Sequence, residues 1–169
     1  MKRTAVLIGA TAALLFAFAG LTQAADKVSA NDFAEEASAK GIAEIETSKL
    51  ALDKGSNAEV KKFAQTMIDD HTRANEELKA LAKKNNLELS DDADLMNKAK
   101  AMILQVRDGE NFDEAYANNQ VVAHEQAIEL YQKAAASDDG EISAWAKKTL
   151  PKLEHHLQMA KDLQGKTRQ

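Results

Sequence analysis

The sequence predicts an all-α fold, a four-helix bundle made of two helical hairpins that are joined by a long helical connection. Ala, Leu, Lys and Glu dominate the chain after residue 28, and these are strong helix formers. Proline occurs once in the whole chain. Apolar residues recur at every third or fourth position in four long segments, and this spacing places them on one face of a helix.

The first 24 residues are expected to be a secretory signal peptide, separate from the folded domain at residues 25–169. A short basic start is followed by an apolar run to Leu21, and small residues precede Ala25, where cleavage is expected. A retained membrane anchor is the alternative interpretation, because the apolar run approaches the length that spans a bilayer. The domain that remains has the size of a single folding unit.

The composition excludes several classes of function. Since Lys2 and Arg3 are the charged residues of the leader, its removal takes the formal net charge from −5 to −7. An acidic domain is a poor binder of nucleic acid. The later sequence has no run apolar enough to span a membrane. The absence of cysteine excludes disulfides, thiolate metal sites and thiol catalysis.

The first hairpin is expected to consist of helices at 30–54 and 56–85. The first of these is expected to stop at Gly55, because glycine readily adopts the left-handed conformation that ends many helices. The second is expected to start at Ser56, where Glu59 three residues later completes a capping box.

The second hairpin is expected after a connection of 25 residues, 86–110, in which 93–106 form a short helix. A connection of this length can run along the whole bundle, whereas a tight turn needs only a few residues. The third long helix opens at Asn111, with Glu114 three residues later, and the fourth follows the turn at 137–140.

Four ionisable residues, one on each long helix, are expected to lie at one level of the bundle. These are Glu44, His71, His124 and His156. At a rise of 1.5 Å per residue they lie roughly 18–26 Å from their hairpin turns, in helices of about 38 Å. They therefore converge just past the middle, whether or not the two turns share an end. Inward-facing ionisable groups are costly unless they are paired or bind a metal.

This level admits three interpretations. It can be a buried polar network in which every imidazole is hydrogen-bonded. It can be a mononuclear transition-metal site with Glu44, His71, His124 and His156 as ligands, for which Zn, Cu or Fe is better suited than Ca or Mg. It can also be a pH-sensitive packing switch, since histidine titrates near neutrality. Met67 and Met159 would favour copper if they joined the site, and core packing is their alternative role.

Neighbouring residues are expected to stay outside this level. Asp70 and His155 are adjacent in sequence to predicted site histidines and therefore point about 100° away from them. Asp113 and Tyr116 are expected to form a hydrogen-bond pair at the end of the bundle. Pro151 lies inside the fourth helix, where it either kinks the helix and aims the histidine that follows, or breaks the helix.

The chain carries four short motifs, Gly41-Ile42-Ala43-Glu44, Asp70-His71, Phe112-Asp113-x-x-Tyr116 with His124, and Leu150-Pro151-x-Leu153-x-x-His156-Leu157. With these motifs, residues 28–165 resemble a bacterial envelope family known as domain of unknown function 4142. The resemblance implies a ferritin-like four-helix bundle that is exported to the periplasm or cell envelope. Members of the family have been labelled outer membrane proteins.

A ferritin-like fold raises the question of a di-iron carboxylate site, and the sequence departs from that pattern. Such sites use a Glu from two helices and a Glu-x-x-His from each of the other two. The residues three positions before the histidines are Ile68, Val121 and Leu153. Glu44 alone matches a ligand role, so ferroxidase or oxygenase activity is not expected.

We therefore expect a non-catalytic bundle of the periplasm or cell envelope with a stress-related or interaction-based role. The alternative is a metal-binding protein whose cofactor is one transition-metal ion at the level of Glu44 and the histidines. A divergent ferritin-like oxidoreductase is the third hypothesis. We expect no nucleic-acid partner and no membrane span after removal of the leader, and the candidate partners are an envelope protein or a second copy of this chain.

Overall fold

The computed structural model describes residues 27–93 and 95–168. The expected leader, residues 1–24, lies outside the described residues. The described residues form five helices, α1 (Ala30–Lys54), α2 (Ala58–Asn85), α3 (Leu95–Gln105), α4 (Gly109–Ala135) and α5 (Gly140–Thr167). None of these helices is both long enough and apolar enough to span a membrane. The predicted all-α fold with its helical connection is confirmed.

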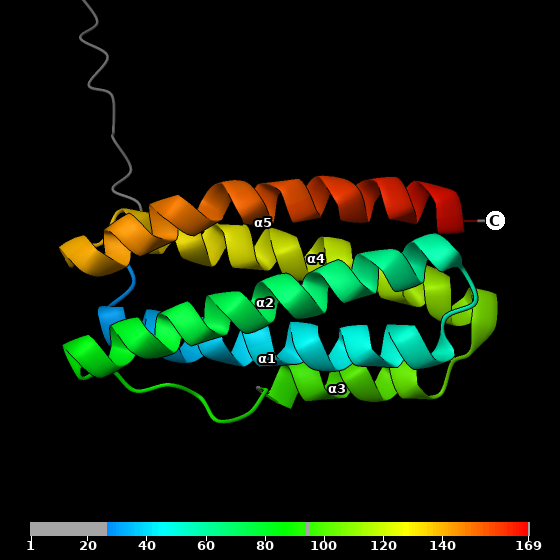
Figure 1. The fold of residues 1–169 in the computed structure, drawn as a ribbon, viewed down its shortest axis with the longest axis horizontal. Helices are drawn as coiled ribbons and strands as arrows, with labels where there is room; N and C mark the ends of the chain where they lie inside the picture. Colours follow the sequence, from blue (N-terminus) through cyan, green and yellow to red (C-terminus); the bar gives the residue numbers. More distant parts are fainter. Residues whose placement is uncertain (1–26, 94, 169) are drawn as a thin grey trace, which may run out of the picture.

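The four long helices run side by side along the longest axis of the molecule (Figure 1). The most extensive contacts are those of α4 with α5 and of α1 with α2, so the two hairpins are the packing units. The α1–α2 turn lies at the end where α5 finishes, and the α4–α5 turn lies at the opposite end (Figure 1). The short helix α3 packs on α1 and carries the chain back along the bundle.

The start of α2 differs from the prediction by a small but informative shift. The cap of this helix is Asn57, whose Oδ1 accepts a hydrogen bond of 2.8 Å from the backbone N–H of Glu59. Ser56 lies outside the helix, and its hydroxyl and backbone N–H both donate to the carboxylate of Asp113 in α4. The helix ends as expected at Asn85, and Asn86, which caps it, adopts the left-handed conformation with φ of 54°.

The prediction for Gly55 was wrong about the cause. Its backbone is extended, with φ −65° and ψ 145°, so no left-handed conformation requires glycine there. Space requires it instead, because a Cβ atom would lie 2.7 Å from the carbonyl oxygen of Ala51 and 2.8 Å from Oδ1 of Asp113. The α1–α2 turn is therefore tightened onto the start of α4.

Asp113 and Tyr116 do not pair with each other, contrary to the expectation. They lie three residues apart on α4, and each reaches a different part of the first hairpin. Asp113 accepts hydrogen bonds from Ser56 and Asn57, which belong to the turn between α1 and α2. The Tyr116 hydroxyl shares a hydrogen bond of 2.8 Å with the hydroxyl of Ser48 inside α1.

The helix α5 continues without a break through Pro151, so the interpretation of a helix break there was wrong. Pro151 lies on the exposed side of the helix. His155 is exposed as well, as its position next to His156 predicted.

The buried core is divided into two apolar clusters. The cluster at the α1–α2 turn contains Ala51, Val60, Phe63, Ala64, Met67, Leu104, Phe112, Tyr116, Ala117, Val121, Ala160 and Leu163. The other contains Phe33, Ala34, Ala37, Leu78, Leu130, Tyr131, Ala134, Ile142, Trp145, Ala146 and Leu153. The members of the two clusters are separated along each long helix by one buried residue of the predicted polar level. These residues are Glu44, His71, His124 and His156. A polar layer therefore separates two apolar halves.

Candidate metal centre

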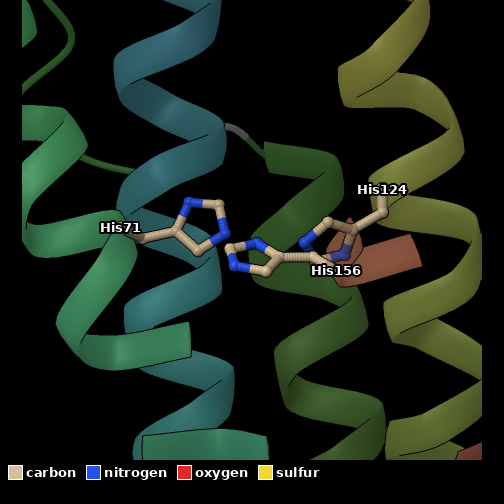
Figure 2. A group of neighbouring side chains, drawn as sticks. All are labelled: His71, His124 and His156. Carbon is tan, nitrogen blue, oxygen red and sulfur yellow. The ribbon is translucent and has the colours of Figure 1, made fainter. Parts of the chain in front are cut away.

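Three histidines from three helices meet in the polar layer. The rings of His71 from α2, His124 from α4 and His156 from α5 converge on one point (Figure 2). Their ring centroids lie 5.4–5.7 Å apart, and one nitrogen of each ring lies within 4.8 Å of the other two. All three side chains are buried, with exposed fractions of 8%, 1% and 2%. The sequence prediction that these histidines share one level is confirmed.

Each of these rings has a nitrogen without a hydrogen-bond partner. The atoms are Nε2 of His71, Nε2 of His124 and Nδ1 of His156, and all are buried. A buried polar atom that is left unpaired costs about 1–3 kcal/mol of folding free energy. Native proteins leave few such atoms, and three in one cluster require an explanation.

Two of the rings are held by hydrogen bonds through their other nitrogen. Nδ1 of His124 lies 2.9 Å from the backbone oxygen of Gln120, which can only accept, so this nitrogen carries the proton. Nε2 of His156 lies 3.0 Å from Oδ2 of Asp70 and donates to that carboxylate. Each of these bonds fixes the tautomer, and the lone pair of the opposite nitrogen then faces the cluster.

Asp70 is itself held in its charged form. Lys152 donates to its Oδ1 over 2.9 Å, and Arg73 lies 3.8 Å from the same oxygen. Burial alone would raise the pKa of Asp70, but the hydrogen bonds from Lys152 and His156 and the charge of Lys152 lower it below its usual value. A carboxylate that orients a histidine in this way is a recurrent partner of metal-binding imidazoles.

His71 and His156 are neutral at neutral pH. Burial lowers the pKa of His71 well below its usual value, and the neighbouring His124 and His156 lower it further. Burial also lowers the pKa of His156, to about 4, although its hydrogen bond to Asp70 opposes the shift. A neutral imidazole has a free lone pair, which is the form that binds a metal ion.

Glu44 lies beside the histidines but outside the group of nitrogens that approach one another within 4.8 Å. Its carboxylate is 7% exposed and accepts a hydrogen bond of 2.7 Å from Nε2 of Gln120. Burial raises the pKa of Glu44, while His124 and Gln120 lower it. A divalent cation nearby would favour the ionised carboxylate. The four-ligand set that includes Glu44 stays a prediction, and the structure brings three of its members together.

Sequence reasoning missed the residues that support the cluster. Asp70 was expected to stay outside the level, but its carboxylate accepts a hydrogen bond from His156 on a different helix and fixes that ring. Gln120 lies one helical turn before His124, and this spacing is the signal that could have identified it. Nothing in the sequence pairs Asp70 with α5. Met67 belongs to the apolar cluster near the α1–α2 turn and Met159 is packed against it, as their core-packing interpretation predicted.

Three converging imidazole nitrogens match the ligand chemistry of Zn, Cu and Fe. In a tetrahedral zinc site with Zn–N distances near 2.0–2.1 Å, two ligand nitrogens lie about 3.4 Å apart. The free nitrogens of the cluster therefore need to approach one another by on the order of 1 Å to bind one ion. The residues present fit a mononuclear ion, and they lack the additional carboxylates of a di-iron centre.

The fold and the site together define an exclusively helical bundle, over the described residues, with a buried three-histidine cluster at its centre. The chain belongs to the family described as domain of unknown function (DUF4142), whose model matches residues 17–163. Among solved structures, it is similar to a DUF305 protein of Streptomyces coelicolor that is described as secreted. The two share 16% sequence identity and a TM-score of 0.69, over 80% of this chain and 89% of that one, which shows a common fold. The curated proteins contain no match to this chain.

Proposed function

We propose that this protein is an exported metal-binding bundle that holds one transition-metal ion with His71, His124 and His156. The observation that carries the proposal is the set of three buried imidazole nitrogens that face one another without hydrogen-bond partners. One bound ion would satisfy all three at once. Two of the rings are already fixed in the tautomer that binding requires.

A purely structural polar network accounts less well for the same geometry. In such a network the rings would bond to one another or to neighbouring groups, and buried networks stabilise a fold only when their members are satisfied. The cluster instead leaves three ring nitrogens and Oε1 of Gln120 unpaired among the described residues. Apolar residues of similar volume would cost less folding free energy than unpaired imidazoles.

The donor set narrows the identity of the ion. Imidazole suits Zn(II), Cu(II) and Fe(II), and the chain has no cysteine that would select a softer site. Affinity among divalent first-row ions generally rises to Cu(II) and falls again at Zn(II). Three protein ligands leave at least one position of a tetrahedral ion open, as in zinc sites that bind water or a substrate.

The proposed location is the periplasm or cell envelope. The expected leader at residues 1–24 directs export, and the similar DUF305 protein is described as secreted. A metal-binding protein in this compartment would meet ions before they enter the cytoplasm. Fractionation of cells that express the full chain tests the location, and a cytoplasmic protein that keeps its leader would contradict it.

Metal analysis of untagged protein tests the proposed binding. The full chain is expressed with its leader, purified from the periplasmic fraction without an affinity tag, and analysed for bound Zn, Cu and Fe by mass spectrometry. We expect close to one ion per chain, and loss of that ion in His71→Ala and His124→Ala. The control is His155→Ala, which removes an exposed histidine and should keep the ion. Absence of bound metal, together with no thermal shift on adding any of the three ions, would refute the proposal.

A further inference from the structure

We propose that the cavity beside the histidine cluster is a small-ligand pocket, in which a metal-bound water, exchangeable for a small anion, donates a hydrogen bond to Glu44. This inference rests on the proposed function, because the water needs the ion. It assigns Glu44 a role that differs from that of a direct ligand. The carboxylate would bind and position the molecule that occupies the open coordination position.

The cavity has a volume of about 30 Å³ and is lined by Glu44, His71 and His124. A single water needs about 10–15 Å³ of such volume, so the cavity has room for a water or a small molecule of two or three heavy atoms. Half of the other residues that line it are small, namely Ala37, Gly41, Ala74, Ala123 and Ala127, and larger ones such as Lys40, Asn75 and Tyr131 complete the wall. The space is therefore left by the lack of larger side chains on three helices.

The cavity lies on the side of the cluster that faces α1. Three of the four long helices contribute a histidine, and α1 contributes Glu44 instead. His71 and His124 line the cavity, whereas His156 does not. An ion held by the three rings would thus have His156 on one side and the cavity on another. Gln126 also lines the cavity and is exposed on α4, so the cavity wall extends to the protein surface.

Glu44 has the capacity to bind a molecule in this cavity. Its Oε2 accepts the hydrogen bond from Gln120, and its other oxygen accepts none from any described residue. An ionised carboxylate only accepts hydrogen bonds and has about four lone-pair sites. A metal-bound water is a strong donor, and a polar cavity of this size beside a carboxylate is where an ordered water is expected.

The position of Glu44 argues against direct ligation. Its carboxylate lies outside the group of ligand atoms that approach within 4.8 Å, and the hydrogen bond from Gln120 holds it there. The packing of α1 on α2 limits its movement. A Cβ atom added at Gly41, one turn before Glu44, would lie 2.1 Å from Oδ1 of Asn75, so the helices are already in close contact.

The test uses the full chain after removal of its metal and loading with Co(II), whose visible spectrum reports coordination. Chelator competition measures the affinity for Co(II), and titration with azide measures access to the open position. We expect wild-type protein to bind Co(II) and to change its spectrum with azide. In Glu44→Gln the Co(II) affinity should fall by less than about a hundredfold, which is the effect of a residue that is not itself a ligand. Azide should bind about tenfold more tightly, because the negative charge that repels it is gone.

A second variant blocks the cavity without touching the cluster. Ala74→Leu on α2 places a larger side chain in the cavity wall. It should retain Co(II) and lose the response to azide, and Ala127→Leu on α4 should do the same. The matched control is Ala80→Leu, an exposed position on the same helix as Ala74, which should behave like wild type.

The outcomes separate this inference from the proposed function. If wild-type protein does not bind Co(II), Zn(II) or Cu(II), the proposed function fails and the pocket fails with it. If Co(II) binds but azide changes neither the wild-type nor the Glu44→Gln spectrum, only the pocket is refuted. A loss of Co(II) affinity of more than about a hundredfold in Glu44→Gln would show direct ligation and overturn the role given to Glu44.

Discussion

Two buried polar residues on α4, Asp113 and His124, lie in opposite circumstances. The carboxylate of Asp113 accepts hydrogen bonds from the N–H and hydroxyl of Ser56 and from the N–H of Asn57, at 2.6–3.2 Å. Nε2 of His124 is equally buried and has no partner among the described residues. All of the hydrogen bonds at Asp113 come from the protein itself, whereas at His124 one ring nitrogen is left without a partner among the described residues.

The presence or absence of hydrogen-bond partners distinguishes a polar group that stabilises the fold from one that is available to bind a ligand. A satisfied buried carboxylate fixes the α1–α2 turn onto α4 and contributes to stability. An unsatisfied imidazole lowers stability and persists where a function requires it. A substitution at His124 should therefore abolish the stabilisation by metal, whereas a substitution at Asp113 should lower stability equally with and without metal. The following predictions run from the largest expected effect to the smallest.

The largest effect is the stabilisation by bound metal. With the free ion at about 1,000 times its dissociation constant, the unfolding free energy of wild-type protein should rise by about 4 kcal/mol. In His124→Ala this rise should vanish, because the cluster loses one of its three ligands. Urea unfolding with Zn(II) and after its removal by a chelator measures both values. An equal rise in the two proteins would contradict the assignment.

Asp113→Ala should lower the unfolding free energy by about 3 kcal/mol, with metal and without it. The reason is that the substitution removes the acceptor for three donors of the α1–α2 turn, and hydrogen bonds to a charged group contribute about 1.5–3 kcal/mol each before relaxation. Urea unfolding measures the loss, and Glu114→Ala, at an exposed acidic residue on the same helix, is the control. A loss of stability that depends on metal would contradict the purely structural role given to Asp113.

The metal-free protein should lose stability as the pH falls from about 6.5 towards 4. Burial lowers the pKa of His156 to about 4 in the folded protein, while an unfolded histidine has a value of 6.5. Within that window the unfolded chain binds more protons, so acid favours unfolding, by roughly 3 kcal/mol for this one group. His71 shifts in the same direction and adds to the loss.

Asp70 should cause a second loss of stability, at a lower pH than the loss caused by His156. The pKa of Asp70 is lowered, so the stability that it contributes is present above its usual value of 3.8 and is lost below it. Unfolding measured in urea at several pH values distinguishes the two ranges. His156→Gln should flatten the curve between pH 6.5 and 4, and an unchanged slope in that variant would count against the neutral, buried His156.

The smallest effect is expected from Asp70→Asn. The amide no longer carries the charge that orients His156 and increases its basicity, so metal affinity should fall by about 10–100-fold, or roughly 1.4–2.7 kcal/mol. Competition with a chelator of known affinity measures this change. Asp69→Asn, next to it on the exposed side of α2, should leave the affinity unaltered. Equal effects of the two substitutions would remove Asp70 from the site.

The sequence predicted the helices and the histidine level because both depend on local rules. A fixed rise per residue converts positions relative to a turn into heights, and the count holds for either arrangement of the hairpins. The hydrogen bond between Asp70 and His156 could not be predicted, because it depends on how α2 and α5 are rotated against each other. The same count placed Glu44 at this level, and its role as a fourth ligand stays a prediction.

The errors at the α1–α2 turn have one physical origin. The general rules for glycine and serine at helix ends assigned a left-handed stop to Gly55 and a cap to Ser56. In the structure Asp113 determines the role of both residues. Its side chain fills the space beside Gly55 and accepts hydrogen bonds from Ser56. A contact between residues 57 positions apart thus overrides two local preferences.

The three histidines come from both hairpins, and the chain has no cysteine. An ion bound to them would act as a covalent-like cross-link, closing loops of 53 residues between His71 and His124 and of 32 residues between His124 and His156. Unlike a disulfide, this cross-link exists only while the protein is folded, because the unfolded chain has no preformed site, so its contribution to stability is the free energy of metal binding. A metal cross-link of this kind would make the stability of the exported protein depend on the supply of metal. The stability of an exported protein with disulfides depends instead on the oxidising conditions of its compartment.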